Sequence, residues 1–372
     1  MKFKFPKITI YDKYMFKQVA LASCVAILLF TIVWIAPETL LNTIKAALSG
    51  EYGFKTALLL LFYELPKILD KAFPVGLLLG TLFTFDKMSK DSELTIFRAV
   101  GMSFPRIVAP VIVLSIIFTF LCFITGDKGT PMAAEKTRAI KGSIRTAQYI
   151  YTQKDSTGHP LIAVVVSKSM DRKLQDVIVL DFSSQVYQDV HQLSNIYSAK
   201  RGIAYDDKWT LEDITNYKIS NDGIYFDIQH IDKMNVLNGE SAKNAFTLMN
   251  YSNVKERDIN NKDLKNYVQL LKKENLSEEY NGTLNKYLQR FFHPLICIIL
   301  AILGSLLGFS KPREQRLIGF TIAIGCIFVY YITLPFFDLL AEKGILSPYI
   351  TSTFPTIAFI IAICAFYKSK DL

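Results

Sequence analysis

Histidine and cysteine side chains are the first candidates for chemistry, because they bind metals and act as bases or nucleophiles. The histidines are scattered without a His-Glu-x-x-His pair, and every cysteine falls in an apolar run: His159, His191, His230, His293, Cys24, Cys122, Cys297, Cys326 and Cys364. The fragments at 50–56 and 126–130 lack the Gly-x4-Gly-Lys-Ser/Thr spacing of an ATP-binding loop. We therefore predict no catalytic residue, no metal and no cofactor in this chain, and we expect the cysteines to be buried and unpaired.

A short mixed-charge stretch, Asp91–Gly101 ("DSELTIFRAVG"), separates two apolar runs. Ser89 or Asp91 can cap the start of a helix, and Gly101 can end one. Pro105 prevents the helix from continuing unchanged into the next run. This pattern predicts a helix within 89–103.

The same stretch has one apolar side. Leu94, Phe97 and Val100 occupy neighbouring positions of a helix, and Glu93 and Arg98 flank them. Such a helix either lies on a membrane surface or docks into a partner protein, and the pattern alone leaves both open.

The composition indicates a membrane protein, since 51% of the 372 residues are hydrophobic and only 20% are charged. Four runs contain no Asp, Glu, Lys or Arg and are long enough to cross a bilayer: Val19–Ala36, Ile107–Ile124, Leu317–Phe337 and Ile350–Tyr367. Two further spans are expected at 291–309 and 57–85, so we predict six. The first run has no small-residue cleavage site after it and is expected to be retained.

Basic residues set the expected orientation. Lys and Arg are concentrated in the N-terminal arm, in the loops 86–106 and 310–316 and in the tail, whereas loops 37–56 and 338–349 hold few. Because cytoplasmic loops are enriched in Lys and Arg, both termini should be cytoplasmic. The expected domains are then 1–126 with three spans, 127–285 outside the membrane, and 286–372 with three spans.

The external segment 127–285 has the pattern of a mostly β domain. Leu161–Val166 and Val177–Phe182 are rich in branched residues, and Ile224, Phe226 and Ile228 alternate with polar residues as in a half-buried strand. Turns are predicted at 206–208 and 221–223. Near the end of the segment, an amphipathic helix is predicted from Leu264, Tyr267, Val268 and Leu271.

Several motifs resemble those of one family, the lipopolysaccharide-export permeases of the LptF/LptG type. Asp91–Ile107 ("DSELTIFRAVGMSFPRI") is similar to the family's coupling-helix stretch, and Ile10–Gln18 ("IYDKYMFKQ") to the segment before its first span. Lys286–Gly308 resembles the start of its fourth span. Lys343–Ile357 matches only in part, with Phe354 and Thr356 where the family usually has other residues.

The resemblance implies a permease subunit in a bacterial inner membrane. It implies a periplasmic jellyroll-like domain, a second permease of the same type, a cytoplasmic ABC ATPase dimer that binds ATP and Mg, and a jellyroll bridge protein that receives lipopolysaccharide. The coupling residues carried over to this chain are Asp91, Glu93, Leu94, Phe97, Arg98, Val100 and Gly101.

Given that resemblance, cations in the expected outer half of the second span become candidates for binding the phosphates of lipid A. Lys67 and Lys71 share one helical face with Glu64, and Asp70 lies beside them. A self-neutralising patch whose lysines reach the interface is the alternative. Further candidates are Lys45, Lys136 and Arg138, for each of which a solvated charge is the alternative.

Two other classes fit the hydropathy. A receptor or scaffold with six spans and an external sensory domain would have a cytoplasmic output module, and the longest predicted cytoplasmic segment is short. A different ABC-type permease would not divide its spans three and three. No nucleic-acid partner is expected.

Overall fold

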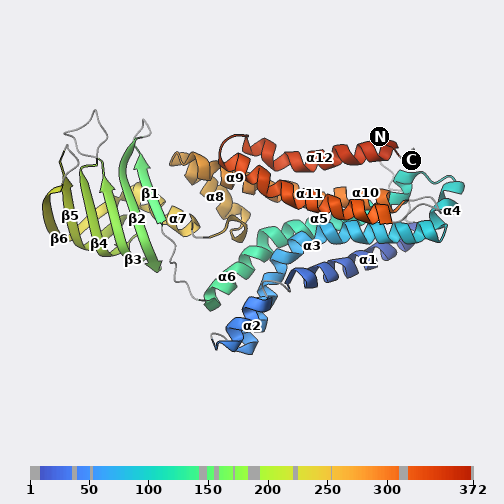
Figure 1. The fold of residues 1–372 in the computed structure, drawn as a ribbon, viewed down its shortest axis with the longest axis horizontal. Helices are drawn as coiled ribbons and strands as arrows, with labels where there is room; N and C mark the ends of the chain where they lie inside the picture. The colour runs from blue at the N-terminus through green and yellow to red at the C-terminus, as the bar shows by residue number, and fades with distance from the viewer. Residues whose placement is uncertain are drawn as a thin grey trace. The chain divides into compact units, whose positions relative to one another are not determined.

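The computed structural model describes residues 9–35, 40–50, 53–141, 149–154, 159–170, 172–182, 193–220, 225–252, 254–309 and 317–369. The chain forms two compact units, drawn in Figure 1. The first combines Met1–Thr137 with Leu284–Leu372, and the second is the segment Arg138–Thr283. The second unit is therefore an insertion within the first.

Long apolar helices make up the first unit. They are α1 (Ile10–Ile35), α3 (Phe54–Lys90), α5 (Phe104–Ile124), α10 (Ile296–Gly308), α11 (Leu317–Glu342) and α12 (Pro348–Ser369). Among the described residues, six stretches are long and apolar enough to cross a membrane, as predicted. The third stretch continues from α5 through a π-helical turn (Thr125–Gly129) into α6 (Thr130–Lys141). The fourth begins in α9 (Ser277–Phe292) and passes through a 3-10 turn (His293–Leu295).

Glycines bring α3 close to two neighbouring helices, α1 and α10, which run alongside it in Figure 1. A Cβ atom at Gly80 would lie 2.5 Å from the Cα atom of Ser23, and one at Gly304 would lie 2.5 Å from the carbonyl oxygen of Leu78. Neither position can hold a larger residue unless the helices separate. Small residues that allow backbones to touch are a usual means of packing helices in lipid, where apolar burial gives little driving force.

The second unit contains a six-stranded antiparallel sheet in which neighbouring strands follow chain order (Figure 1). The strands are β1 (Tyr149–Lys154), β2 (Pro160–Met170), β3 (Lys173–Asp181), β4 (Asn195–Ala204), β5 (Lys208–Ile219) and β6 (Tyr225–Asn238). The strands predicted at Leu161–Val166 and Val177–Phe182 are β2 and β3, and the turn predicted at 206–208 joins β4 to β5. The sheet is consistent with the predicted jellyroll-like domain. The turn predicted at 221–223 lies outside the described residues.

Two helices contribute to the apolar core of this unit. On α7 (Gly239–Ser252), Ala242 accepts a hydrogen bond from the indole of Trp209 on β5, at 3.2 Å. The amphipathic helix predicted near the end of the segment is α8 (Asn261–Lys273), and its four predicted apolar residues are all buried. Burial raises the pKa of Tyr267 on this helix to about 12.

The predicted orientation of β6 is wrong at Ile228. The strand forms, but the Ile228 side chain is 64% exposed. Within the described sheet β6 pairs only with β5, and α7 follows it directly. Among the β6 residues whose burial is described, the buried one is Leu237, which pairs with Trp209. Alternation along a strand identifies its two faces but not which face another element covers.

Candidate functional site

The loop between α3 and α5 holds a one-turn reversal followed by a short helix. α3 runs to Lys90, Ser92 adopts a left-handed conformation with φ of 60°, and α4 spans Glu93–Ala99. The expected caps are wrong, because α4 begins after Ser92 without a side-chain cap and Ser89 donates instead to the carbonyl of Gly308, at 3.1 Å. Gly101 has φ of 90°, which fits its predicted role in ending the helix.

α4 packs one side against its own chain and exposes the other. Leu94 is buried and Phe97 is half-buried against the core around α3 and α5, whereas Val100 is 78% exposed. Leu94 and Val100 are about 120° apart around a helix, too far for all three predicted apolar residues to face the same partner. The exposed apolar residues of this segment are Ile96 and Val100.

The beginning of α1 holds α4 and the start of α5. The Tyr14 hydroxyl lies 3.1 Å from both carboxylate oxygens of Glu93, and the Tyr11 ring meets the Phe97 ring edge-on at 4.8 Å. Arg106 at the start of α5 donates two hydrogen bonds to Asp12, at 2.6 and 2.8 Å. A bidentate pair of this kind fixes the relative orientation of its two helices.

The remaining coupling candidates are solvent-facing. Arg98 extends from α4 over the Phe309 ring, 5.6 Å from its centroid, at the end of α10. Asp91 is exposed and forms the C-cap of α3. Contacts therefore connect α4 with α1 and with the end of α10, and α1 in turn with the start of α5.

Aromatic side chains hold two of the three candidate lysines in the first unit's helices α3 and α6. Lys67 pairs with Glu64 at 3.1 Å. The Lys71 ammonium lies 4.8 Å from the ring centroid of Trp34 on α1, and that of Lys136 on α6 lies 5.7 Å from that of Tyr63 on α3. The sequence did not indicate Trp34 and Tyr63 as partners of these lysines, because each ring lies on a different helix from its lysine.

The other two candidate cations are not brought into these contacts. Lys45 is exposed on α2 (Leu41–Leu48). Arg138 is exposed on α6 and belongs to the second unit. They remain predictions.

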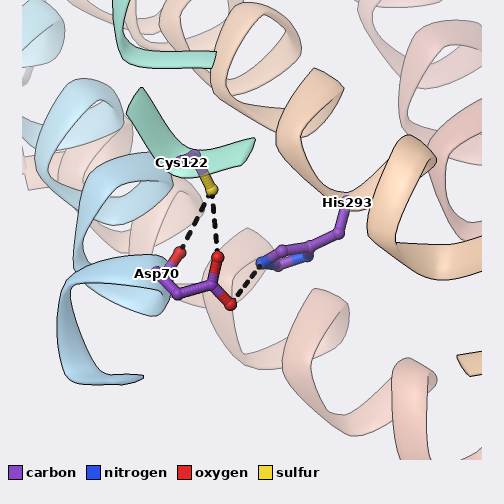
Figure 2. A group of neighbouring side chains, drawn as sticks. All are labelled: Asp70, Cys122 and His293. Carbon is purple, nitrogen blue, oxygen red and sulfur yellow. Dashed lines mark hydrogen bonds and ion pairs between the residues drawn. The ribbon is translucent and has the colours of Figure 1, made fainter. Parts of the chain in front are cut away.

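Three donor side chains from separate segments converge: Asp70 from the middle of α3, Cys122 from the C-terminal end of α5 and His293 from the turn before α10 (Figure 2). The Cys122 sulfur lies 3.2 Å from Oδ1 of Asp70, and His293 Nε2 lies 3.9 Å from its Oδ2. On its other side, His293 Nδ1 lies 2.8 Å from the hydroxyl of Tyr330. The three residues are far apart in the sequence, so spacing along the chain does not reveal this set.

A second polar cluster joins α9, α11 and α12. Asp338 accepts hydrogen bonds from Asn285 and Gln289, at 2.8 and 2.7 Å, and pairs with Lys286. Thr351 donates to the side-chain oxygen of Asn285 at 2.9 Å. The hydrogen-bond donors and acceptors of this polar cluster pair with one another, so the cluster links the three helices and serves their packing.

Comparison with known proteins identifies a family and a relative. Residues 13–369 match the family described as "Lipopolysaccharide export system permease LptF/LptG". A relative from Haemophilus influenzae, "Lipopolysaccharide export system permease protein LptG", is 25% identical over 181 residues, which cover 47% of this chain and 49% of that protein. The matched segment thus spans about half of the relative, whereas the family match extends over nearly all of this chain.

Proposed function

The chain belongs to the LptF/LptG family of lipopolysaccharide export system permeases, and from that premise we propose that it is the permease subunit of an ABC transporter. It extracts lipopolysaccharide from the outer leaflet of the inner membrane, while a separate cytoplasmic ATPase supplies the energy. The observation that carries the proposal is that residues 13–369 of this chain match the family, together with the six apolar spans of its described residues. Both termini are then cytoplasmic and the sheet unit is periplasmic.

The coupling proposal divides the candidate residues between two roles. The exposed side chains of Ile96 and Val100 meet the ATPase. Leu94 and Phe97 transmit the displacement of α4 into the core around α3 and α5, and Glu93 transmits it to α1 through Tyr14. A helix held on several sides moves its neighbours with it, which is what a mechanical coupling element requires.

The glycolipid proposal rests on cations at the membrane boundary. The ammonium groups of Lys71 and Lys136 lie against the rings of Trp34 and Tyr63, and these cation–π contacts place positive charge where a phosphate group of the glycolipid can meet it. Glu64 competes for Lys67 and so weakens phosphate binding there, which favours release. Lys45 and Arg138 remain further proposed phosphate ligands.

The sheet supports a hand-off through its edges. Within the described sheet, β1 and β6 each have one neighbouring strand, so each offers backbone donors and acceptors along a free side. A second jellyroll can add to such an edge by strand pairing. The bridge protein and the second permease are proposed partners on this basis and on the family.

Purification of the full chain from its native membrane in mild detergent tests the assembly. Mass spectrometry of the bound material should identify an ABC ATPase, a permease of the same family and lipid A. An unrelated polytopic protein purified in the same way from the same membrane is the control. Recovery of this chain with neither ATPase nor glycolipid would count against the transporter.

A further inference from the structure

The carboxylate of Asp70 is an ionisable group within a membrane span. Its described contacts are the Cys122 thiol and the His293 ring, and no described lysine or arginine forms an ion pair with it. An ionisable residue at such a position is costly unless it is neutralised, and it commonly marks a functional site. The question is what balances its charge.

The three donors lie at the same level of their helices. At about 1.5 Å per residue, Asp70 is about 24 Å along α3 from Asp86, and Cys122 is about 27 Å along α5 from Phe104. His293 is about 24 Å from Phe309 on the same scale. All three donors are therefore at about the same depth, measured from the end of the spans next to α4.

The donor atoms have the separations of a metal ligand set. The three lie within 4.8 Å of one another, from 3.2 Å between sulfur and oxygen upward. Tetrahedral zinc with Cys, His and Asp ligands sets its donor atoms about 3.3 to 3.8 Å apart. Small side-chain rotations close the difference, because the donors already face a common point (Figure 2).

The surroundings of His293 match those of a metal-binding histidine. Ligand histidines usually donate their second ring N–H to an oxygen, which fixes the tautomer that leaves the other nitrogen free to coordinate. Nδ1 of His293 is 2.8 Å from the Tyr330 hydroxyl, and Nε2 is the nitrogen directed at Asp70. The Nδ1–H tautomer thus presents the Nε2 lone pair to the centre of the cluster.

We infer that Asp70, Cys122 and His293 form a binding site for a divalent transition metal of the zinc class. The Cys122 thiol loses its proton to water when the metal binds, so the ion, the thiolate and the carboxylate sum to zero charge, which suits a poorly solvated position. The fourth position is open, since the Asp70 and His293 side chains are 32% and 17% exposed. The bound ion joins α3, α5 and the turn before α10.

Cobalt titration of the purified full chain tests the site. The protein is prepared without a polyhistidine tag, and a chelator removes any bound metal before the titration. A phosphine reductant is present because Cys297 lies beside Cys122 and the two thiols could oxidise to a disulfide. We expect one Co²⁺ per chain with a thiolate-to-cobalt charge-transfer band, and displacement of that ion by Zn²⁺. Absence of the band in the unmodified protein at saturating cobalt would overturn the inference without reference to any variant.

Variants locate the ion. Cys122→Ser should abolish the band, and Asp70→Asn or His293→Gln should weaken binding at least tenfold. Tyr330→Phe should keep the band with about tenfold weaker binding, because it removes only the oxygen that orients the histidine. Cys326→Ser on α11 is the matched control and should bind as the unmodified chain does; binding that survives Cys122→Ser unchanged would refute the site.

Discussion

At the level of single residues, the candidate lysines differ in what holds them. Lys67 has a carboxylate partner, Lys71 has the face of Trp34, and Lys136 has that of Tyr63. The face of an aromatic ring attracts the cation through its quadrupole, whereas a carboxylate accepts hydrogen bonds from the ammonium group. The residues are therefore not equivalent as phosphate ligands.

Charge reversal at the lysines tests the glycolipid site. Lys67→Glu with Lys71→Glu should lower photocrosslinking of the chain to lipid A about tenfold, because two cations become repulsive to phosphate. Lys343→Glu reverses an exposed charge in the loop between α11 and α12 and is the control. Equal crosslinking of lipid A to the unmodified chain, the double variant and Lys343→Glu would support the alternative, a self-neutralising patch whose lysines reach the membrane interface.

Charge reversal at Glu93 tests coupling. Glu93→Lys removes the acceptor of the Tyr14 hydrogen bond, so displacement of α4 should no longer reach α1. We expect at least a tenfold loss of ATP-dependent glycolipid release from membranes, with normal amounts of the chain in them. Glu93→Gln keeps an acceptor and should retain most release; full activity of Glu93→Lys would remove Glu93 from the coupling path.

Among the elements, α4 has an inner and an outer side that substitutions can separate. Leu94→Ala should lower the stability of this chain by about 2 to 4 kcal/mol, since Leu94 is buried. Val100→Glu should leave the melting temperature unchanged and reduce copurification of the ATPase. Loss of ATPase binding from Leu94→Ala alone, at normal stability, would reverse this assignment.

Close helix contacts make a second prediction for the elements. Gly304→Leu forces α10 away from α3, so overpacking should cost about 1 to 3 kcal/mol or more and broaden the elution peak in detergent. Gly325→Leu on α11 meets nothing within 4 Å and should behave as the unmodified chain. The comparison fails if both variants elute alike.

On the scale of the whole molecule, orientation can be read by labelling. Asp207→Cys in the turn between β4 and β5 should react with a membrane-impermeant maleimide in cells whose outer membrane alone is permeabilised. Thr95→Cys on α4 should react only after the inner membrane is opened. The unmodified chain, whose cysteines lie in the spans, gives the background. The opposite pattern would invert the proposed topology.

The sequence predicted the spans and α8 well because transfer into lipid and helical periodicity are properties of contiguous residues. It did not predict that Asp70, Cys122 and His293 meet, since that depends on which spans pack together. The division of α4 into inner and outer sides was missed for the same reason. Ile228 shows what strand patterns leave undetermined: the alternation of side chains can be read from the sequence, but not which face of the sheet another element covers.

Uneven burial of the spans has a mechanical consequence. Within the chain, 67% of the most apolar part of α3 is buried, against 22% for α12 and 11% for α11. If a single molecule is pulled from its C-terminus, extraction of α12 and α11 breaks the polar cluster around Asp338 but exposes less buried surface. Extraction of α10 must separate it from α3 across the glycine contacts. We expect a low-force step followed by a high-force step. The pair α3 and α10 is then the part of the molecule that resists mechanical force most, and α11 and α12 are held to it less firmly.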